Sequence, residues 1–218
     1  MNDFPFQAAI FDLDGTLLDS HHVWPDIDVK FLLKRGISPV PEDYSENLAS
    51  MTFRETAEYT IERFHLDEQP EDLMQEWNQM AIDAYSHEVQ LKPGARDYLL
   101  QLKNSGIRLG VCTALPKKLH VPCLQNLGVY DWFDAIVSTD DAVKGKSHPE
   151  PFLLTAARLG VSPKDCIMYE DTPAAVSGAL QAGMRVCGVY DIGTKKHVNL
   201  MKTLADRYIY SFDELLIK

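Results

Sequence analysis

Two aspartates separated by a single residue follow a short apolar run near the start of the chain. Residues 8–11 are apolar, and Asp12, Leu13 and Asp14 come directly after them. An apolar run of this length is typical of a buried strand, and open α/β sheets bind their ligands outside the carboxyl ends of their strands. Because two carboxylates held so close together repel each other, we expect a cation to share this site, and a metal ion is the simplest candidate.

The same pair of residues has the chemistry of a covalent phosphoryl transfer. One carboxylate can attack as a nucleophile and form an acyl-phosphate, while a second carboxyl group exchanges protons with the leaving group and with water. Gly15 allows a tight turn after them. An Asp-x-Asp-Gly sequence is also typical of turns and helix caps, so this segment alone leaves both interpretations open.

Three further segments place polar residues after apolar runs or before a predicted helix. Thr113 and Ala114 offer a hydroxyl and a backbone N–H to a phosphate oxygen, and Lys146 can neutralise its charge. Glu170 and Asp171 are oxygen ligands of the kind that suit Mg²⁺. Each segment alone has an ordinary explanation as a turn, a solvated lysine or a helix cap. Their joint occurrence in one chain favours a phosphate site with a bound Mg²⁺.

These residues need a sheet that brings the strand ends together. Beyond residues 8–11, the sequence predicts strands over residues 107–112, 135–138, 166–169, 185–189 and 208–209. Between them it predicts helices over residues 94–106, 117–127, 149–159, 173–182 and 196–205. Such alternation predicts an α/β fold with right-handed crossovers and a mostly parallel sheet flanked by helices.

The region over residues 20–87 has a different pattern. Apolar residues at helical spacing predict helices over residues 23–35, 52–64 and 70–85, and no convincing strand is found. Thr52 and Glu55 have the spacing of a capping box at the start of the second of these helices. We therefore expect an all-helical insert between the first strand and the rest of the sheet.

Composition excludes several classes of partner. The chain has 218 residues and a net charge of −11, which argues against nucleic acid and against an anionic membrane surface. We see no apolar run long enough to span a membrane and no secretory signal in residues 1–6. The four cysteines form no C-x-x-C pair, so we expect free buried thiols and a cytoplasmic location.

Taken together, the motifs resemble those of the haloacid dehalogenase-like hydrolase superfamily. Residues 11–17 (FDLDGTL) match its first motif, and Thr113, Lys146 and residues 170–171 match the other three in order and spacing. The helical insert resembles the cap of the subfamily that includes β-phosphoglucomutase and phosphoglycolate phosphatase-like enzymes. The resemblance implies a Rossmann-like core over residues 1–18 and 88–218, with a helical cap domain over residues 19–87.

The resemblance also implies a role for each motif residue. Asp12 would be the nucleophile and a metal ligand, and Asp14 would be the general acid/base that also binds the metal through its backbone carbonyl. Asp171 and Glu170 would complete the Mg²⁺ site. The phosphoryl group would be held by Thr113, Ala114 and Lys146. The implied activity is a Mg²⁺-dependent phosphatase for a small phosphorylated metabolite such as a sugar phosphate. The oligomeric state stays open, and a monomer is compatible with the sequence.

Two alternatives remain. A phosphomutase would pass the phosphoryl group to a sugar phosphate, and Arg54 is placed like the mutase arginine that contacts the distal phosphate. However, mutase-like members carry a histidine five residues after the aspartate that aligns with Asp19, and here that residue is Trp24. A catalytically idle binding protein on the same fold is the alternative from another class, and it would be expected to lack one of the motif residues.

Overall fold

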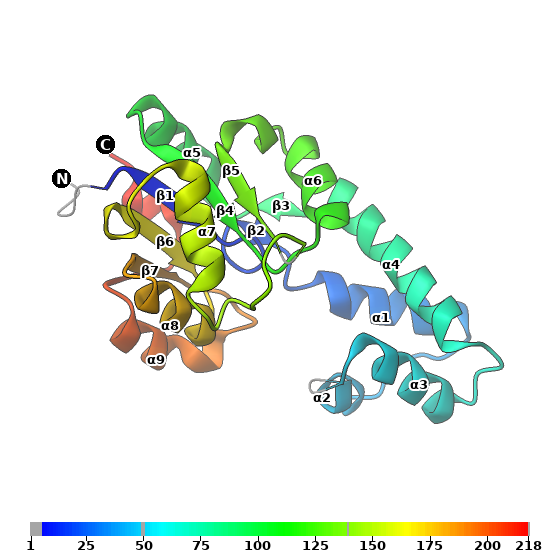
Figure 1. Ribbon diagram of the computed structural model, residues 1–218. Helices are drawn as coiled ribbons and strands as arrows, with labels where there is room; N and C mark the ends of the chain where they lie inside the picture. Colours follow the sequence, from blue (N-terminus) through cyan, green and yellow to red (C-terminus); the bar gives the residue numbers. More distant parts are fainter. Residues whose placement is uncertain (1–5, 49–50, 139, 218) are drawn as a thin grey trace. The chain divides into compact units, whose positions relative to one another are not determined.

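The larger unit of the protein is built on a six-stranded sheet in which all strands are parallel (Figure 1). The computed structural model describes residues 6–48, 51–138 and 140–217. The prediction that residues 1–6 carry no secretory signal therefore falls almost wholly outside the described residues. The strand order is β5–β4–β1–β6–β7–β8. The strands are β1 (Ala8–Phe11), β4 (Arg108–Cys112), β5 (Ala135–Val137), β6 (Cys166–Glu170), β7 (Arg185–Val189) and β8 (Arg207–Ile209). The central strand β1 thus has β4 and β6 as its neighbours.

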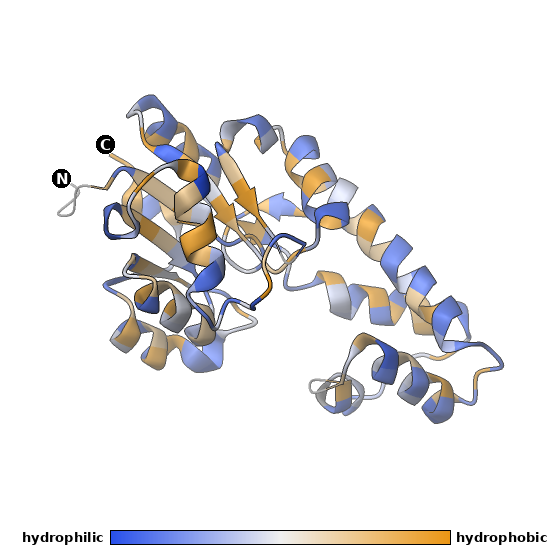
Figure 2. Ribbon diagram, viewed as in Figure 1, coloured by the Kyte–Doolittle hydropathy of each residue, from blue (hydrophilic) through white to orange (hydrophobic). Residues whose placement is uncertain are grey.

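Helices cover both faces of this sheet. They are α5 (Ala95–Asn104), α6 (Lys117–Asn126), α7 (Glu150–Leu159), α8 (Pro173–Gln181) and α9 (Val198–Leu204). The described residues also form 3₁₀ turns, η1 (Tyr130–Trp132), η2 (Pro163–Asp165), η3 (Lys195–His197) and η4 (Phe212–Leu215). On one face Ile10 and Met168 belong to the hydrophobic core that α7 and α8 close. The strands are coloured mainly as hydrophobic in Figure 2, as expected for strands buried on both sides.

The opposite face is filled by aromatic side chains because successive strand residues point to opposite faces. Phe11 stacks on Tyr169 with ring centroids 4.5 Å apart, and Tyr98 of α5 and Phe212 of η4 pack against the same pair. The hydroxyls of Tyr98 and Tyr169 lie 2.5 Å apart. These buried rings hold β1 and β6 side by side at their carboxyl ends, next to the residues that follow both strands.

A short antiparallel pair, β2 (Leu18–Asp19) with β3 (Gln90–Leu91), joins the points where the chain leaves and re-enters the larger unit. The sequence did not predict this pair, because strands of two residues show no periodicity. The compact units defined by contacts are Met1–His21 with Val89–Lys218, and His22–Glu88.

The second unit is helical and contains α1 (Val23–Lys34), α2 (Tyr44–Leu48), α3 (Phe53–Phe64) and α4 (Pro70–His87). Thr52 caps α3, and its capping box with Glu55 is present as predicted. Arg35, just after α1, pairs with Glu76 of α4 at 2.8 Å and with Glu68, which precedes α4, at 2.5 Å. The three longer helices carry both hydrophobic and hydrophilic residues along their length, consistent with one buried side each (Figure 2).

The predicted mostly parallel α/β fold is confirmed, with strand and helix ends within a few residues of those expected. The helix α2 was not predicted, since five residues are too few to show helical periodicity. All four cysteines are buried and free. Among the described residues, no helix combines the length and the apolar character that crossing a membrane requires.

Candidate active site

Three carboxylates meet at the carboxyl ends of two adjacent strands. Asp12 follows β1, Glu170 ends β6, and Asp171 comes next. The register pairs Phe11 with Tyr169, and the backbone N–H of Asp12 donates to the carbonyl of Tyr169 at 3.0 Å. All three acidic side chains are buried, and each offers an oxygen within 4.8 Å of the others. The parallel pairing of β1 and β6 therefore gathers residues that lie far apart in the sequence.

A single lysine balances part of this charge. The Nζ atom of Lys146 lies 2.7 Å from Oδ1 of Asp12 and 2.7 Å from Oε2 of Glu170. The loop that carries Lys146 packs tightly on α8 at Gly178, where an added Cβ would lie 2.2 Å from the Lys146 carbonyl oxygen. A glycine at this helical position thus permits the approach that places the lysine between the two carboxylates.

Glu170 has nearly all its hydrogen-bonding capacity engaged. Its Oε1 accepts from the backbone N–H of Asp171, the backbone N–H of Thr172 and the hydroxyl of Thr172, while Oε2 accepts from Lys146. A carboxylate oxygen has about two lone-pair sites, so three donors fully engage Oε1, whereas among the described residues Oε2 accepts from Lys146 alone. Glu170 therefore has less capacity left for a cation than Asp12 and Asp171, and its free oxygen position is the one that contacts Lys146.

The electrostatics of the cluster fit a cation that the protein chain does not itself supply. Burial, followed by the charge of Glu170, raises the pKa of Asp12 to about 7. Burial, followed by Glu170 and Asp12, raises the pKa of Asp171 to about 8. Burial would lower the pKa of Lys146, but Asp12 and Glu170 raise it above its usual value. Three carboxylates around one ammonium group leave an excess of negative charge, and buried carboxylate oxygens are the ligands that Mg²⁺ prefers.

The metal-free protein is expected to be less stable at about pH 8.5 than at about pH 5.5, by several kcal/mol. Because the folded-state pKa values of Asp12 and Asp171 are raised, the folded protein binds more protons than the unfolded chain above about pH 4. The free energy of unfolding therefore falls as pH rises toward the folded values. Tm measured with a chelator at both pH values tests this, and Mg²⁺ is expected to restore Tm at the higher pH.

The control for this experiment is the double variant Asp12→Asn/Asp171→Asn, which removes both titrating groups. We expect its Tm to change much less between the two pH values. An equal pH dependence in this variant and in the parent protein would show that other groups cause the effect.

The loop after Asp12 is arranged around Asp171. Gly15 has a φ of +72°, and a Cβ added there would lie 2.7 Å from Oδ2 of Asp171. The hydroxyl of Thr16 donates to Oδ1 of Asp171 at 3.2 Å, and the hydroxyl of Ser20 donates to Oδ1 of Asp14 at 2.7 Å. Sequence reasoning gave Thr16 and Ser20 no role. Thr16 belongs to the first motif, whereas nothing in the sequence distinguishes Ser20, which is buried in the structure, from other serines of the chain.

Thr113 follows β4, the other neighbour of β1. It is buried, its backbone N–H donates to the carbonyl of Val137, and its hydroxyl accepts from the N–H of Leu115 at 3.0 Å. Ala114 is exposed next to it. The buried His120 lies with Nδ1 3.0 Å from the carbonyl of Leu115 and so supports the same loop. The sheet order therefore places the Thr113 loop and the carboxylate cluster at the same end of three adjacent strands.

Arg54 belongs to the helical unit, where it lies near the start of α3. Its guanidinium pairs with Glu71 at 2.5 Å and with Glu58 at 3.7 Å, and its side chain is 54% exposed. Trp24 packs edge-to-face on Phe53 with centroids 6.1 Å apart and is partly exposed. The two glutamates offset the charge of Arg54 within its own unit.

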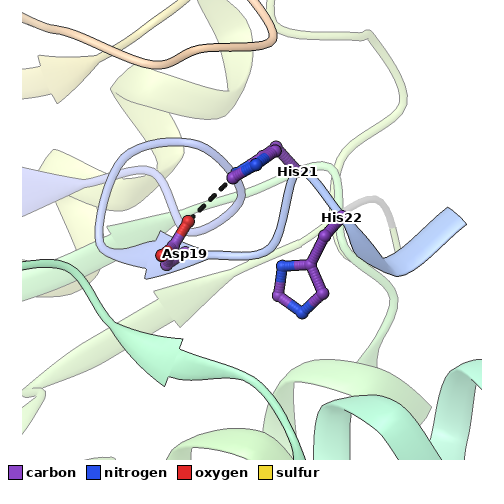
Figure 3. Close-up of side chains that lie close together, drawn as sticks. All are labelled: Asp19, His21 and His22. Atoms are coloured by element: carbon purple, nitrogen blue, oxygen red, sulfur yellow. Dashed lines mark hydrogen bonds and ion pairs between the residues drawn. The ribbon is translucent and has the colours of Figure 1, made fainter. Parts of the chain in front are cut away.

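Two further side chains that could bind a metal ion, Asp19 and His21, lie in β2 and just after it. Nδ1 of His21 is 3.0 Å from Oδ1 of Asp19, as Figure 3 shows together with His22. Both members of the pair are about half-exposed, and an exposed pair of this kind is a common surface feature. We assign it no part in catalysis.

A parallel sheet with acidic residues and a lysine at the ends of its central strands defines an α/β protein with a charged ligand site. The family model of haloacid dehalogenase-like hydrolases matches residues 9–189, and the chain belongs to this family. It is 33% identical over 199 residues to a β-phosphoglucomutase of Bacillus subtilis, covering 84% of this chain and 83% of the relative. It is 28% identical over 184 residues to a phosphorylated carbohydrates phosphatase of Thermotoga maritima, covering 84% and 85%.

The fold is also similar to that of solved structures of this family. The crystal structure of a putative β-phosphoglucomutase from Thermotoga maritima superposes with a TM-score of 0.84 at 26% identity, covering 96% of each chain. The relatives thus include both phosphatases and phosphomutases, and the family assignment alone does not separate these two activities.

Proposed function

We propose that this protein is a Mg²⁺-dependent phosphatase that hydrolyses a small phosphorylated metabolite, such as a sugar phosphate, through an aspartyl-phosphate on Asp12. The observation that carries the proposal is the buried group of Asp12, Glu170 and Asp171 with Lys146 between two of them. Such a group has an anionic nucleophile, a fixed cation and spare negative charge for a metal ion. The named phosphatases among the relatives support the same reaction class.

Each proposed role follows from the contacts of the residue. Asp12 and Asp171, with the backbone carbonyl of Asp14, would hold Mg²⁺, and the ion would offset the charge of the phosphoryl oxygens. Lys146 has three N–H donors. Two are directed at Asp12 and Glu170, and the third would bind a phosphoryl oxygen. Glu170 would act mainly by orienting Lys146.

Turnover would take two steps. In the first, an oxygen of Asp12 attacks phosphorus, the bond from phosphorus to the ester oxygen breaks, and Asp14 gives its proton to the leaving oxygen. In the second, water attacks the same phosphorus and gives a proton to Asp14, and the bond to Asp12 breaks to release phosphate. Thr113 and the N–H of Ala114 would hold the phosphoryl oxygens during both steps. The hydroxyl of Ser20 donates to the Asp14 carboxylate and would hold it in position between the first step and the second.

The helical unit is proposed to act as the cap that selects the substrate and excludes water. When such a cap closes, bulk water would be excluded from the phosphoryl group and a single water molecule would be left to attack it. Cap residues that admit water as the acceptor would make the enzyme a phosphatase, and cap residues that bind a sugar phosphate as the acceptor would make it a mutase.

A phosphomutase is the second candidate, and the B. subtilis relative favours it. Two features of this chain favour the phosphatase. Trp24 stands where mutase-like members carry a histidine, and Arg54 is paired with Glu71 and Glu58 inside its own unit. The negative charges of these two glutamates offset the positive charge of Arg54, which reduces its attraction to a second phosphate group.

The test is a phosphate-release assay across a panel of sugar phosphates and other small phosphate esters, with Mg²⁺. We expect at least one member to release inorganic phosphate with a kcat/KM above about 10⁴ M⁻¹s⁻¹, the lower end of ordinary enzymes. Hexose 1-phosphates are followed separately for conversion into 6-phosphates. Isomerisation with little free phosphate would establish the mutase instead, and neither product with any substrate would favour the idle binding protein.

A further inference from the structure

Lys92, just after β3, makes a set of buried contacts beside the candidate active site, and none of the four motifs includes it. We propose that Lys92 is a positioning residue that fixes the carbonyl of Gly15 and thereby sets the Asp14–Gly15 segment against Asp171. The proposal rests on the proposed function, since Asp14 and Asp171 act in that mechanism.

All three N–H donors of the Lys92 ammonium group have partners. The Nζ atom donates to the carbonyl of Gly15 at 2.5 Å and to the carbonyl of Tyr190 at 2.7 Å, and it lies 2.7 Å from Oδ2 of Asp191. The side chains of Lys92 and Asp191 are only 11% and 4% exposed. A buried ammonium with three such partners is held in one position. It therefore joins the loop after β1 to the loop after β7.

The loop after β1 has little freedom to move without disturbing Asp171. The space beside Gly15 is filled by the Asp171 carboxylate, with Oδ2 at 2.7 Å from an added Cβ. The backbone N–H of Lys92 also donates to the carbonyl of Leu17 at 2.8 Å. Lys92 thus holds this loop at two carbonyls, those of residues 15 and 17. A shift of the Gly15 carbonyl would move the neighbouring Asp14 and its proposed metal-binding carbonyl.

Asp191 is the counter-charge that makes this arrangement stable. Its Oδ1 accepts from the N–H of Gly193 at 2.7 Å, and its Oδ2 pairs with Lys92. Removing Lys92 alone would leave a buried, unpaired carboxylate near the acidic cluster, which is strongly destabilising. A loss of activity in that variant could come from instability, so the positioning role needs a charge-balanced test.

The test compares Lys92→Met with the double variant Lys92→Met/Asp191→Asn. The double variant removes both charges, and the Asn carbonyl can still accept from Gly193. Arg158→Met serves as the control, because Arg158 also joins a carboxylate and a backbone carbonyl, those of Asp141 and Ile136. Tm, hydrogen exchange of a peptide over residues 13–20, Mg²⁺ affinity by calorimetry, and kcat and KM are measured for all variants.

In the double variant we expect Tm to recover most of the loss seen in Lys92→Met. Exchange over residues 13–20 is expected to rise about tenfold, because the loop loses its donor. We expect Mg²⁺ affinity to fall about tenfold, and kcat to fall roughly 10–100-fold with KM within about threefold. Arg158→Met should leave exchange over residues 13–20 unchanged.

Parent-like exchange over residues 13–20 in the double variant would overturn the proposal. So would full recovery of kcat and Mg²⁺ affinity together with Tm, since Lys92 would then be purely structural. If the parent protein releases no phosphate from any substrate, the proposed function fails. Exchange and Mg²⁺ affinity still decide the role of Lys92 in that case.

Discussion

Asp12→Asn is expected to lower the rate of phosphate release by roughly 10⁴-fold or more, the scale seen when a nucleophile is removed. The amide is a poor nucleophile and cannot form the acyl-phosphate. The protein should fold normally, because Asp12 is a buried carboxylate whose pKa is already raised by burial and by Glu170. Replacing it with a neutral side chain of the same size removes charge repulsion from the cluster. Initial rates with the best substrate of the panel measure the effect.

The matched control is Asp165→Asn. Asp165 precedes β6 and accepts the backbone N–H of Gln7 at its carbonyl, at the opposite end of the same strands. The same chemical change there should leave kcat within about threefold and Tm within a few degrees, as for most changes outside a site or core. Retention of more than about 1% of parent activity in Asp12→Asn would contradict the mechanism, given the loss expected for a nucleophile.

Lys146→Met is expected to combine a large loss of activity with a loss of stability. The ammonium group neutralises Asp12 and Glu170, each at 2.7 Å, and is itself only 15% exposed. Removing one partner of a buried pair typically costs about 3–5 kcal/mol. Because Lys146 is also proposed to bind the phosphoryl group, we expect kcat/KM to fall about 10³-fold or more. Chemical denaturation with a chelator, and kinetics with Mg²⁺, measure the two effects separately.

Lys144→Met is the control, since Lys144 is exposed and only two residues away in the same loop. It should change neither quantity appreciably. Mg²⁺ is expected to recover part of the stability lost in Lys146→Met, because a divalent cation can balance the same carboxylates. A variant with parent-like stability in the presence of chelator would show that Lys146 does not balance the buried charge.

Much of the fold follows from local patterns. Apolar runs of four to six residues identify every predicted strand except the short one over residues 208–209, and the helices follow from helical spacing and from caps such as Thr52. The elements that the sequence missed, β2, β3 and α2, have two to five residues, which is too short for any periodicity. Chain order also predicted that Asp12, Thr113 and Asp171 follow strands, since a polar residue after an apolar run marks the end of that strand.

The residue types at the strand ends, and the chemistry they can perform, can be read from the amino-acid order alone. Which of these residues contact one another depends on the folded arrangement. The order β4–β1–β6 brings Asp12 beside Glu170, and Lys146 reaches both from a separate loop. Lys92 contacts Gly15, which lies 77 positions earlier in the chain, and Tyr190, which lies 98 positions later. Such contacts depend on strand order and side-chain packing, which leave no spacing pattern in the chain.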